Sequence, residues 1–359
     1  MVMKKPPRLA YFNFEESLLS QVAHDYSLAD NIRFCPILLD GDHCTLIDVR
    51  SATSKKMVLE SSGEWLFLKQ IPWYCDDQTM DFALEWQVQL AGSGFSVPVV
   101  RQRRSGERVL RVTGNRLVLF DYVWGTRYQG RQDEQVAAAA CLGRLHSLEG
   151  PSTGPHGDAF DTAADHIQLA RELVGEAPSV SSALDRMQLL VDSWRDHATL
   201  HGWHNLPQRA VHGDFSPWNL VYHPDGQVEA VLDFDNAHLG PVIRDLVEAL
   251  LTFCCVRYAH DSTSFATTPP DALPVKQATA MLRAYEAERP LTDEEHGCAP
   301  EVAGAVAVEL GCLGLIRGDY STDSIEQLIS WAVEVRHDVE RLFLSRPAIA
   351  SMKDEGVAR

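Results

Sequence analysis

The sequence predicts an α+β fold, in which a β-rich N-terminal region precedes a mainly helical C-terminal region. Three observations support this fold class. Short β-type runs separated by Gly, Asp and Ser fill most of the first ~125 residues and suggest antiparallel hairpins. One helical pattern, at residues 80–94, interrupts these runs. After Gly125, long stretches of helical periodicity dominate, so the two regions differ in their expected secondary structure.

Apolar residues at helical spacing predict that the N-terminal region begins with a helix at 15–29. The strands are expected at 34–39, 44–49, 55–60 and 64–71 and, beyond the helix at 80–94, at 96–102, 108–113 and 116–123. Glycine closes the helix at 80–94. We therefore expect a small sheet with one inserted helix.

The C-terminal region combines long helices with a few short strands. Helices are expected at 133–148, 161–201, 245–259 and 275–344. Short strands are expected at 210–213, 219–223 and 229–234, and a Pro224-Asp225-Gly226 turn joins the last two. The sequence shows no internal repeat and no low-complexity tract.

Length and charge limit the possible partners. The chain has 359 residues, of which 45% are hydrophobic, so it can bury a sizeable core and is longer than one typical domain. Its formal net charge is −18, which repels polyanions such as nucleic acids and anionic membrane surfaces. A cationic substrate would be attracted. Net charge alone does not separate that role from simple solubility.

The cysteines and the apolar segments indicate the compartment. The chain has eight cysteines, scattered and without a CxxC pair, so a disulfide framework is not expected and a reducing compartment fits best. The basic N-terminal residues are not followed by an apolar segment, so we expect no signal peptide. The longest apolar runs are short and each contains a Glu, so we expect no transmembrane helix. These features predict a cytoplasmic protein.

The stretch RAVHGDFSPWNLVYHPDGQVEAVLDFDNAHLGP, residues 209–241, is the most informative. Asp214 follows a short apolar strand, Asn219 lies five positions later, and Asp233 ends another apolar strand. Because the turn folds the two strands back on each other, Asn219 and Asp233 are expected close together. An amide oxygen beside a carboxylate forms the hard, oxygen-only site that Mg²⁺ prefers. Asp214 could then accept a hydrogen bond from a substrate hydroxyl and orient it for attack.

A second HGD, at 156–158, tests how specific these letters are. No apolar strand precedes it, Ala163 stands where an Asn would be needed, and no LDFD follows at the right distance. We interpret that copy as an ordinary loop. The prediction at 209–241 therefore depends on the Asn and on the strand-ending Asp233, together with the flanking strands.

This spacing is that of a kinase catalytic loop, with an Asp, an Asn five positions on, and a metal-binding Asp after the next hairpin. Here HGDFSPWN at 212–219 and LDFD at 232–235 resemble the motifs of the aminoglycoside phosphotransferase and choline kinase-like family, including its type II homoserine kinase branch. The DLVEALL segment at 245–251 is similar to the family's as well. The resemblance implies a two-lobed, protein-kinase-like fold that uses ATP and Mg²⁺, with an N-lobe at 1–124 and a helical C-lobe at 125–359.

The resemblance also implies cofactor-binding residues upstream. Lys69, at the end of an apolar strand, would contact the ATP phosphates, and Glu85 on the following helix would hold Lys69. The linker between the lobes would be the run RLVLFDYVWG. Its backbone would hydrogen-bond adenine, with hinge positions Phe120, Asp121, Tyr122 and Val123.

One segment departs from the kinase pattern. The candidate phosphate-covering loop, LLDGDHCTLIDV, contains only Gly41, whereas such a loop should be glycine-rich. The chain has neither a Walker A sequence nor a GxGxxG after a strand, so a Rossmann fold is not indicated. The two histidines of HGWH, at 201–204, lack a third ligand, and a surface loop explains them better than zinc.

Three further residues of the motif have assigned or open roles. His212 is expected to orient the backbone of the catalytic loop, and Asp245 to hydrogen-bond that loop from its helix. Asp235 could contact a second Mg²⁺ or a cationic substrate, or could be a solvated turn residue.

The motifs favour transfer of the γ-phosphoryl group of ATP to a hydroxyl of a small molecule, such as an amino alcohol, an amino acid or an aminoglycoside. A kinase acting on Ser or Thr of a peptide is the first alternative. A pseudokinase-type nucleotide-binding module is the second, favoured by the glycine-poor loop and opposed by the intact set of Lys69, Asp214, Asn219 and Asp233. The acceptor has no sequence signature.

Overall fold

The computed structural model describes residues 16–29, 32–35, 55–258 and 268–344. Contacts divide the chain into two compact units. Unit 1 comprises Met1–Gly157, Gln208–Asp245 and Ala287–Arg289, and unit 2 comprises Asp158–Pro207, Leu246–Glu286 and Pro290–Arg359. The expected lobe boundary at 124 is a different division and stays a prediction. Unit 1 contains every site residue predicted from the sequence.

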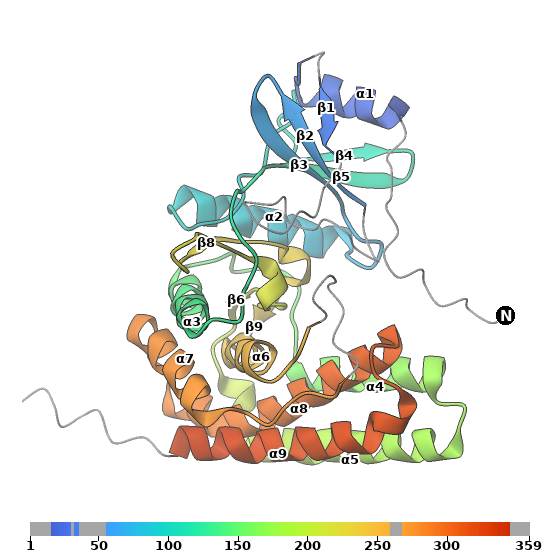
Figure 1. Cartoon of the computed structure of the whole chain (residues 1–359), viewed down its shortest axis with the longest axis vertical. Coiled ribbons are helices and arrows are strands. Elements are labelled where there is room, and N and C mark those ends of the chain that lie inside the picture. Colours follow the sequence, from blue (N-terminus) through green and yellow to red (C-terminus); the bar gives the residue numbers. More distant parts are fainter. Residues whose placement is uncertain (1–15, 30–31, 36–54, 259–267, 345–359) are drawn as a thin grey trace, which may run out of the picture. The chain divides into compact units, whose positions relative to one another are not determined.

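A five-stranded antiparallel sheet forms the first part of unit 1, with the strand order β1-β2-β3-β5-β4 (Figure 1). Its strands are β1 (Arg33–Cys35), β2 (Lys56–Ser61), β3 (Glu64–Gln70), β4 (Val109–Val112) and β5 (Asn115–Asp121). Tight turns join β2 to β3 and β4 to β5, and each turn contains a Gly with positive φ, Gly63 and Gly114. The antiparallel hairpins expected from the sequence are therefore confirmed.

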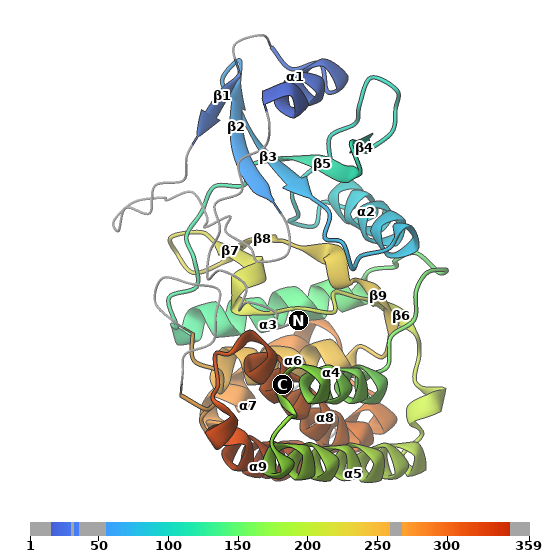
Figure 2. The same ribbon diagram turned by 90° about the vertical axis from the view of Figure 1, so that its right-hand side faces the viewer.

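The two faces of this sheet carry different helices (Figures 1 and 2). Helix α1 (Glu16–Asp25) covers the face of Leu66, Leu68 and Leu119, because its apolar residues join the same buried cluster. Helix α2 (Asp77–Gly92) contributes Met80 and Leu84 to a second cluster, with Val118 and Phe120. Since side chains alternate along a strand, neighbouring residues of β3 and β5 serve opposite faces.

The remaining part of unit 1 holds the catalytic-loop sequence. Helix α3 (Gln132–Ser147) is followed, after unit 2 residues, by two small antiparallel sheets. One pairs β6 (Arg209–Val211) with β9 (His238–Gly240), and the other pairs β7 (Leu220–Tyr222) with β8 (Val228–Val231). Short 3-10 turns, η2 (Pro217–Asn219) and η3 (Phe234–Asn236), follow the catalytic loop and Asp233. Helix α6 (Ile243–Cys254) follows β9, and its residues from Leu246 on belong to unit 2.

Unit 2 is helical in its described part. Its helices are α4 (Ala159–Val174), α5 (Pro178–Leu200), α7 (Val275–Glu288), α8 (Asp293–Arg317) and α9 (Ile325–Leu344), with the 3-10 turns η1 (Trp203–Asn205) and η4 (Thr322–Ser324). Thr292 and Glu295 form a capping box that starts α8, and Gly318 ends it in the left-handed conformation. Among the described residues α8 is the one helix long and apolar enough to cross a membrane, but 89% of its apolar stretch is buried inside the protein, as in a core helix.

Some expected elements differ from those observed. The run 96–102 does not form a strand of the sheet, since Pro98 removes a donor and a single bridge joins Val100 to Phe120. Helix α6 ends at Cys254, earlier than the apolar pattern suggests. Most of the expected strand at 34–39, all of the one at 44–49 and the Gly41 loop lie outside the described residues.

Candidate active site

The catalytic loop starts where β6 ends, at His212 and Gly213. Gly213 has a φ of +78°, and a Cβ at this position would collide with the backbone carbonyl of Asn236, so the turn requires glycine. The carboxylate of Asp245 accepts hydrogen bonds from the backbone N–H groups of His212, at 2.6 Å, and Gly213, at 3.0 Å. The expected hydrogen bonds from Asp245 to this loop are therefore confirmed.

Asp245 is the centre of a fully buried polar network. Nε2 of His146, on α3, lies 3.3 Å from its Oδ2, and both side chains have no solvent-exposed surface. Burial alone would raise the pKa of Asp245, but His146, Arg244 and His212 hold it well below its usual value. No sequence motif marks His146, because its partner lies 99 positions away.

His212 connects the catalytic loop to the strand that carries Asp233. Its Nε2 lies 2.8 Å from the backbone oxygen of Leu232, and its Nδ1 accepts a hydrogen bond from the backbone N–H of Asp214 at 3.2 Å. A carbonyl only accepts and an amide N–H only donates, so these contacts require the neutral tautomer protonated on Nε2. Burial lowers the pKa of His212, in agreement with a neutral ring.

This burial predicts a pH-dependent stability. A histidine in the unfolded chain has a pKa of about 6.5. In the folded protein the pKa of His212 is lower than this value. Between these values the unfolded chain binds more protons, so we expect the free energy of unfolding to fall as the pH drops below about 6.5. Urea unfolding at about pH 7.5 and about pH 5.5, one unit on either side of the unfolded pKa, measures this fall in the free energy of unfolding. The fall between the two pH values should be smaller in His212→Asn than in the wild type, and unchanged in the control His24→Asn, whose histidine is exposed. An equal fall in the wild type and both variants would contradict the prediction.

Asn219 fixes the carboxylate that precedes it. Its Nδ2 donates to the backbone oxygen of Asp214 at 2.8 Å and to Oδ2 of Asp214 at 2.9 Å. Because the amide nitrogen of Asn219 faces Asp214, its amide oxygen points away from Asp214. The backbone N–H of Leu232 donates to the carbonyl of Asn219 at 2.8 Å, so the β7–β8 hairpin places Asn219 opposite the residue before Asp233.

Asp233 adopts the left-handed conformation, with a φ of +64°, where the chain leaves β8. Such a conformation is uncommon for a residue other than Gly, but Asp tolerates it better than most. Nζ of Lys69 lies 2.6 Å from Oδ1 of Asp233 and 2.7 Å from Oδ1 of Asp235. Nζ of Lys56 lies 3.2 Å from Oδ2 of Asp233. Each oxygen of the Asp233 carboxylate therefore contacts one ammonium group.

The pKa values of these groups follow from the same contacts. Burial would lower the pKa of Lys69, but the carboxylates of Asp233 and Asp235 raise it above its usual value. Burial would raise the pKa of Asp233, but Lys56 and Lys69 keep it well below its usual value. The pKa of Asp235 is raised, first by burial and also by the Asp233 charge, although Lys69 opposes the rise.

The expected pairing of Glu85 with Lys69 is wrong in this structure. Glu85 is exposed on α2, where it accepts a hydrogen bond from Nε2 of Gln89 at 3.2 Å. Buried Leu84 and Gln87 show that the inner face of α2 excludes position 85. The described partners of Lys69 are instead Asp233 and Asp235.

The predicted hinge continues directly from β5. The backbone N–H of Asp121 donates to Val99 O, and that of Tyr122 to Trp65 O at 3.0 Å. Phe120 is buried on the α2 face, whereas the carboxylate of Asp121 turns to Arg101. Only the backbone of Asp121 would therefore be able to hydrogen-bond a nucleobase. Within the described residues the backbone N–H of Val123 has no acceptor, so it remains available to one.

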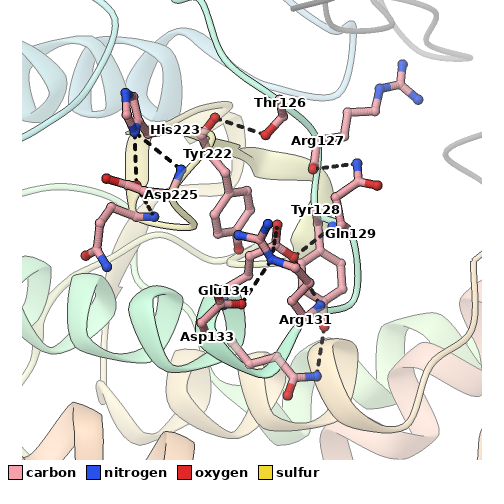
Figure 3. A network of polar contacts seen from close by, with 12 residues as sticks. Thr126, Arg127, Tyr128, Gln129, Arg131, Asp133, Glu134, Tyr222, His223 and Asp225 are labelled. Carbon is pink, nitrogen blue, oxygen red and sulfur yellow. Dashed lines mark hydrogen bonds and ion pairs between the residues drawn. The ribbon is translucent and has the colours of Figure 1, made fainter. Parts of the chain in front are cut away.

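The hinge leads into a polar network beside the β7–β8 hairpin (Figure 3). Thr126 and Tyr222 exchange two backbone hydrogen bonds, of 2.7 and 2.9 Å. A Cβ on Gly125 would collide with Val221, so glycine permits this close approach. The carboxylate of Glu134 accepts the backbone N–H groups of Gln129 and Arg131, which ties the same segment to the start of α3. The chain that leaves the hinge is thus joined to the hairpin that carries Asn219.

The HGD copy at 156–158 has an ordinary structural function. Asp158 caps the N-terminus of α4 by accepting the backbone N–H groups of Phe160 and Asp161, and it also accepts the indole N–H of Trp203 at 2.7 Å. The interpretation of this copy as an ordinary loop is confirmed. Within the described residues no group of three or more His, Cys, Asp and Glu side chains could hold a metal ion. Any metal at Asp233 would therefore rely on amide, phosphate or water oxygens.

Comparison with known proteins identifies the family. Residues 55–291 match the model of the phosphotransferase enzyme family. The chain belongs to this family. It is therefore a kinase-type phosphotransferase, and the resemblance to aminoglycoside phosphotransferases and choline kinases inferred from 212–219 and 232–235 is confirmed.

Curated relatives of this family member share low identity with it. A homoserine kinase of Nitrobacter hamburgensis is 23% identical over 231 residues, which cover 64% of this chain and 65% of that protein. A homoserine kinase of a Caulobacter species is 22% identical over 310 residues, which cover 83% of this chain and 85% of that protein. The chain thus spans about 65% of the length of the first of these relatives.

Solved structures of kinases share the fold of this phosphotransferase. The microcompartment-associated aminopropanol kinase aligns with a TM-score of 0.63 at 18% identity, over 92% of this chain and 98% of that one. Choline kinase LicA of Streptococcus pneumoniae aligns with a TM-score of 0.58 at 12% identity, over 90% of this chain and 98% of that one. The predicted fold class, kinase-like with a β-rich N-terminal and a helical C-terminal region, is confirmed. The cytoplasmic location stays a prediction.

Proposed function

We propose that this phosphotransferase moves the γ-phosphoryl group of ATP, with Mg²⁺, to an alcohol hydroxyl of a small molecule. Asp214 is the residue that receives the acceptor hydroxyl, and Asn219 and Asp233 are the metal ligands. Lys69 and the hinge backbone at Asp121 and Val123 bind the nucleotide. The observation that supports this most directly is the pair of hydrogen bonds from Asn219 to Asp214, beside the hairpin end that carries Asp233.

The metal assignment agrees with the donor atoms present. The amide nitrogen of Asn219 is committed to Asp214, which leaves its oxygen, and Asp233 keeps a pKa well below its usual value, so it is fully ionised. These are hard oxygen donors, few in number, as Mg²⁺ accepts when phosphates and water complete its shell. When bound there, Mg²⁺ would neutralise phosphate charge.

Asp214 is held in one orientation. Its Oδ2 accepts the Asn219 amide, its backbone N–H is bonded to His212, and its backbone oxygen also accepts from Asn219. The carboxylate therefore needs little reorganisation to accept a hydrogen bond from an alcohol. Orientation of the hydroxyl, with removal of its proton, is the contribution that this chain makes at the acceptor.

The acceptor class is inferred from several weaker observations. The structural relatives named above act on aminopropanol and choline, and the curated ones on homoserine, all small hydroxyl compounds with an amino or ammonium group. The net charge of −18 favours such cationic molecules. An amino alcohol or an amino acid with a side-chain hydroxyl is therefore the expected acceptor.

The test is ATP turnover with amino alcohols, hydroxy amino acids, aminoglycosides and a Ser/Thr peptide library. We expect turnover with a member of the first three groups. Asp214→Asn should lower kcat by about a thousandfold, or about 4 kcal/mol, while Mg·ATP binding measured by calorimetry stays within about twofold. Turnover with peptides alone would replace the small-molecule proposal. Absence of both turnover and Mg·ATP binding would reject the enzyme assignment, and full activity of Asp214→Asn would reject the mechanism.

A further inference from the structure

Lys56 contacts Asp233 across 177 positions of sequence, and no sequence motif marks it. Lys56 is the first residue of β2 and lies directly opposite Lys69 in the β2–β3 register. Both ammonium groups contact the same carboxylate, Lys56 at 3.2 Å and Lys69 at 2.6 Å from Asp233. The two lysine side chains are largely buried, with 16% and 6% of their surface exposed.

Two like charges at directly opposed positions of an antiparallel pair destabilise a sheet. Here Asp233 and Asp235 offset that repulsion, so two ammonium and two carboxylate groups balance in one partly buried cluster. In the proposed function Asp233 binds the metal. A cation that takes up the Asp233 oxygens must therefore displace the ammonium groups that contact them now.

A displaced, largely buried ammonium group needs another anion, since an unpaired buried charge is costly. Asp235 is bonded to Lys69 and offers that lysine a remaining partner. Lys56 has Asp233 as its ion-pair partner in the described residues. The anion that arrives with the metal in the proposed reaction is the polyphosphate of ATP.

We propose that Lys56 is a second phosphate-binding lysine, which leaves Asp233 when the metal arrives and then binds the β- or γ-phosphate. This inference rests on the proposed function. It also offers a physical reason why the expected phosphate-covering loop is poor in glycine: between residues 36 and 54 the sequence has one glycine, Gly41. A side-chain ammonium group supplies charge neutralisation that backbone N–H groups of a glycine-rich loop otherwise provide.

Lys55 offers a matched control. It precedes Lys56, and its backbone oxygen accepts from Gln70, so the chain is still extended there. Because successive side chains of an extended chain point to opposite faces, Lys55 points away from Asp233. Lys55→Met removes the same charge as Lys56→Met, one position away and from the other face.

Calorimetry with adenosine, with ATP in EDTA, with Mg·ATP and with Mg²⁺ alone tests the proposal. Lys56→Met should weaken Mg·ATP binding about tenfold or more, should affect the binding of ATP in EDTA less, because Lys56 stays bonded to Asp233 without the metal, and should leave adenosine binding unchanged. It should also strengthen binding of Mg²⁺ alone, because an ammonium group no longer competes for Asp233. Lys55→Met should match the wild type in every titration, and Lys56→Arg should retain most of the ATP affinity.

The outcomes separate this inference from the proposed function. A wild-type protein that binds neither ATP nor Mg·ATP would reject the proposed function itself. A wild type that binds Mg·ATP, together with a Lys56→Met protein that binds Mg·ATP equally well, would reject the role of Lys56 alone. Equal losses in Lys56→Met and Lys55→Met would also reject it, because they would indicate a general electrostatic effect. If Lys56→Met does not fold, Lys56→Gln replaces it in the same titrations.

Discussion

Asp233→Asn is expected to lower kcat/KM on the order of a thousandfold or more, or about 4 kcal/mol. The substitution keeps the size of the side chain but removes the charge that Lys56 and Lys69 now contact at 3.2 and 2.6 Å. We expect the Mg²⁺ concentration needed for half-maximal activity to rise as well, because the proposed site would lose its one carboxylate. Initial rates across a range of Mg²⁺ and ATP concentrations measure both effects.

Glu229→Gln is the control for Asp233→Asn. Glu229 is an exposed acid on the same strand, β8, and its loss removes the same charge from the same hairpin. It should change kcat/KM less than about twofold. An Asp233→Asn enzyme with an unaltered Mg²⁺ requirement would show that Asp233 serves the ion pairs and not a metal.

Asp245→Asn is expected to have the largest effect on stability, a loss of about 3–5 kcal/mol in the free energy of unfolding. The two oxygens of Asp245 accept the backbone N–H groups of His212 and Gly213. An amide offers one oxygen, so its NH₂ group would face a donor in a fully buried position. Breaking a buried, charge-assisted network of this kind leaves donors unsatisfied.

Urea unfolding at neutral pH measures this loss, with Asp225→Asn as the control. Asp225 is an exposed acid in the β7–β8 turn, and Asn can replace its hydrogen bond to the Gln227 N–H, so the expected change is within about 0.5 kcal/mol. If the free energy of unfolding of Asp245→Asn fell by as little as that of Asp225→Asn, the catalytic loop would keep its conformation without the Asp245 carboxylate. Catalytic activity of the folded fraction should fall too, since the loop carries Asp214.

The sequence predicted those parts of the site that follow from local spacing. Asp214, Asn219 and Asp233 lie on one hairpin and its preceding loop, so their proximity depends on a single turn. The antiparallel sheet was predictable for the same reason, because each of its observed hairpins has a short turn between two apolar runs. Local patterns decide such features almost alone.

Features that depend on tertiary contacts were missed or misplaced. Glu85 is on the expected helix, but the face of a helix that turns inward is set by packing, and here position 85 faces outward. His146 and Lys56 meet their partners across 99 and 177 positions of sequence, so no local pattern marks them. β9 is only three residues long, and its pairing with β6 is what makes it a strand.

The division of the chain into two units has a consequence for protein engineering. Every residue proposed above to bind the nucleotide or the metal, or to accept the proton, belongs to unit 1, which is assembled from separate stretches of sequence. The intervening stretches Asp158–Pro207 and Leu246–Glu286 belong to unit 2. Chimeras that exchange these inserted stretches with those of a related kinase would therefore keep all of these proposed residues of the recipient. Such exchanges would introduce diversity only into the unit that contains none of the residues proposed above for phosphoryl transfer.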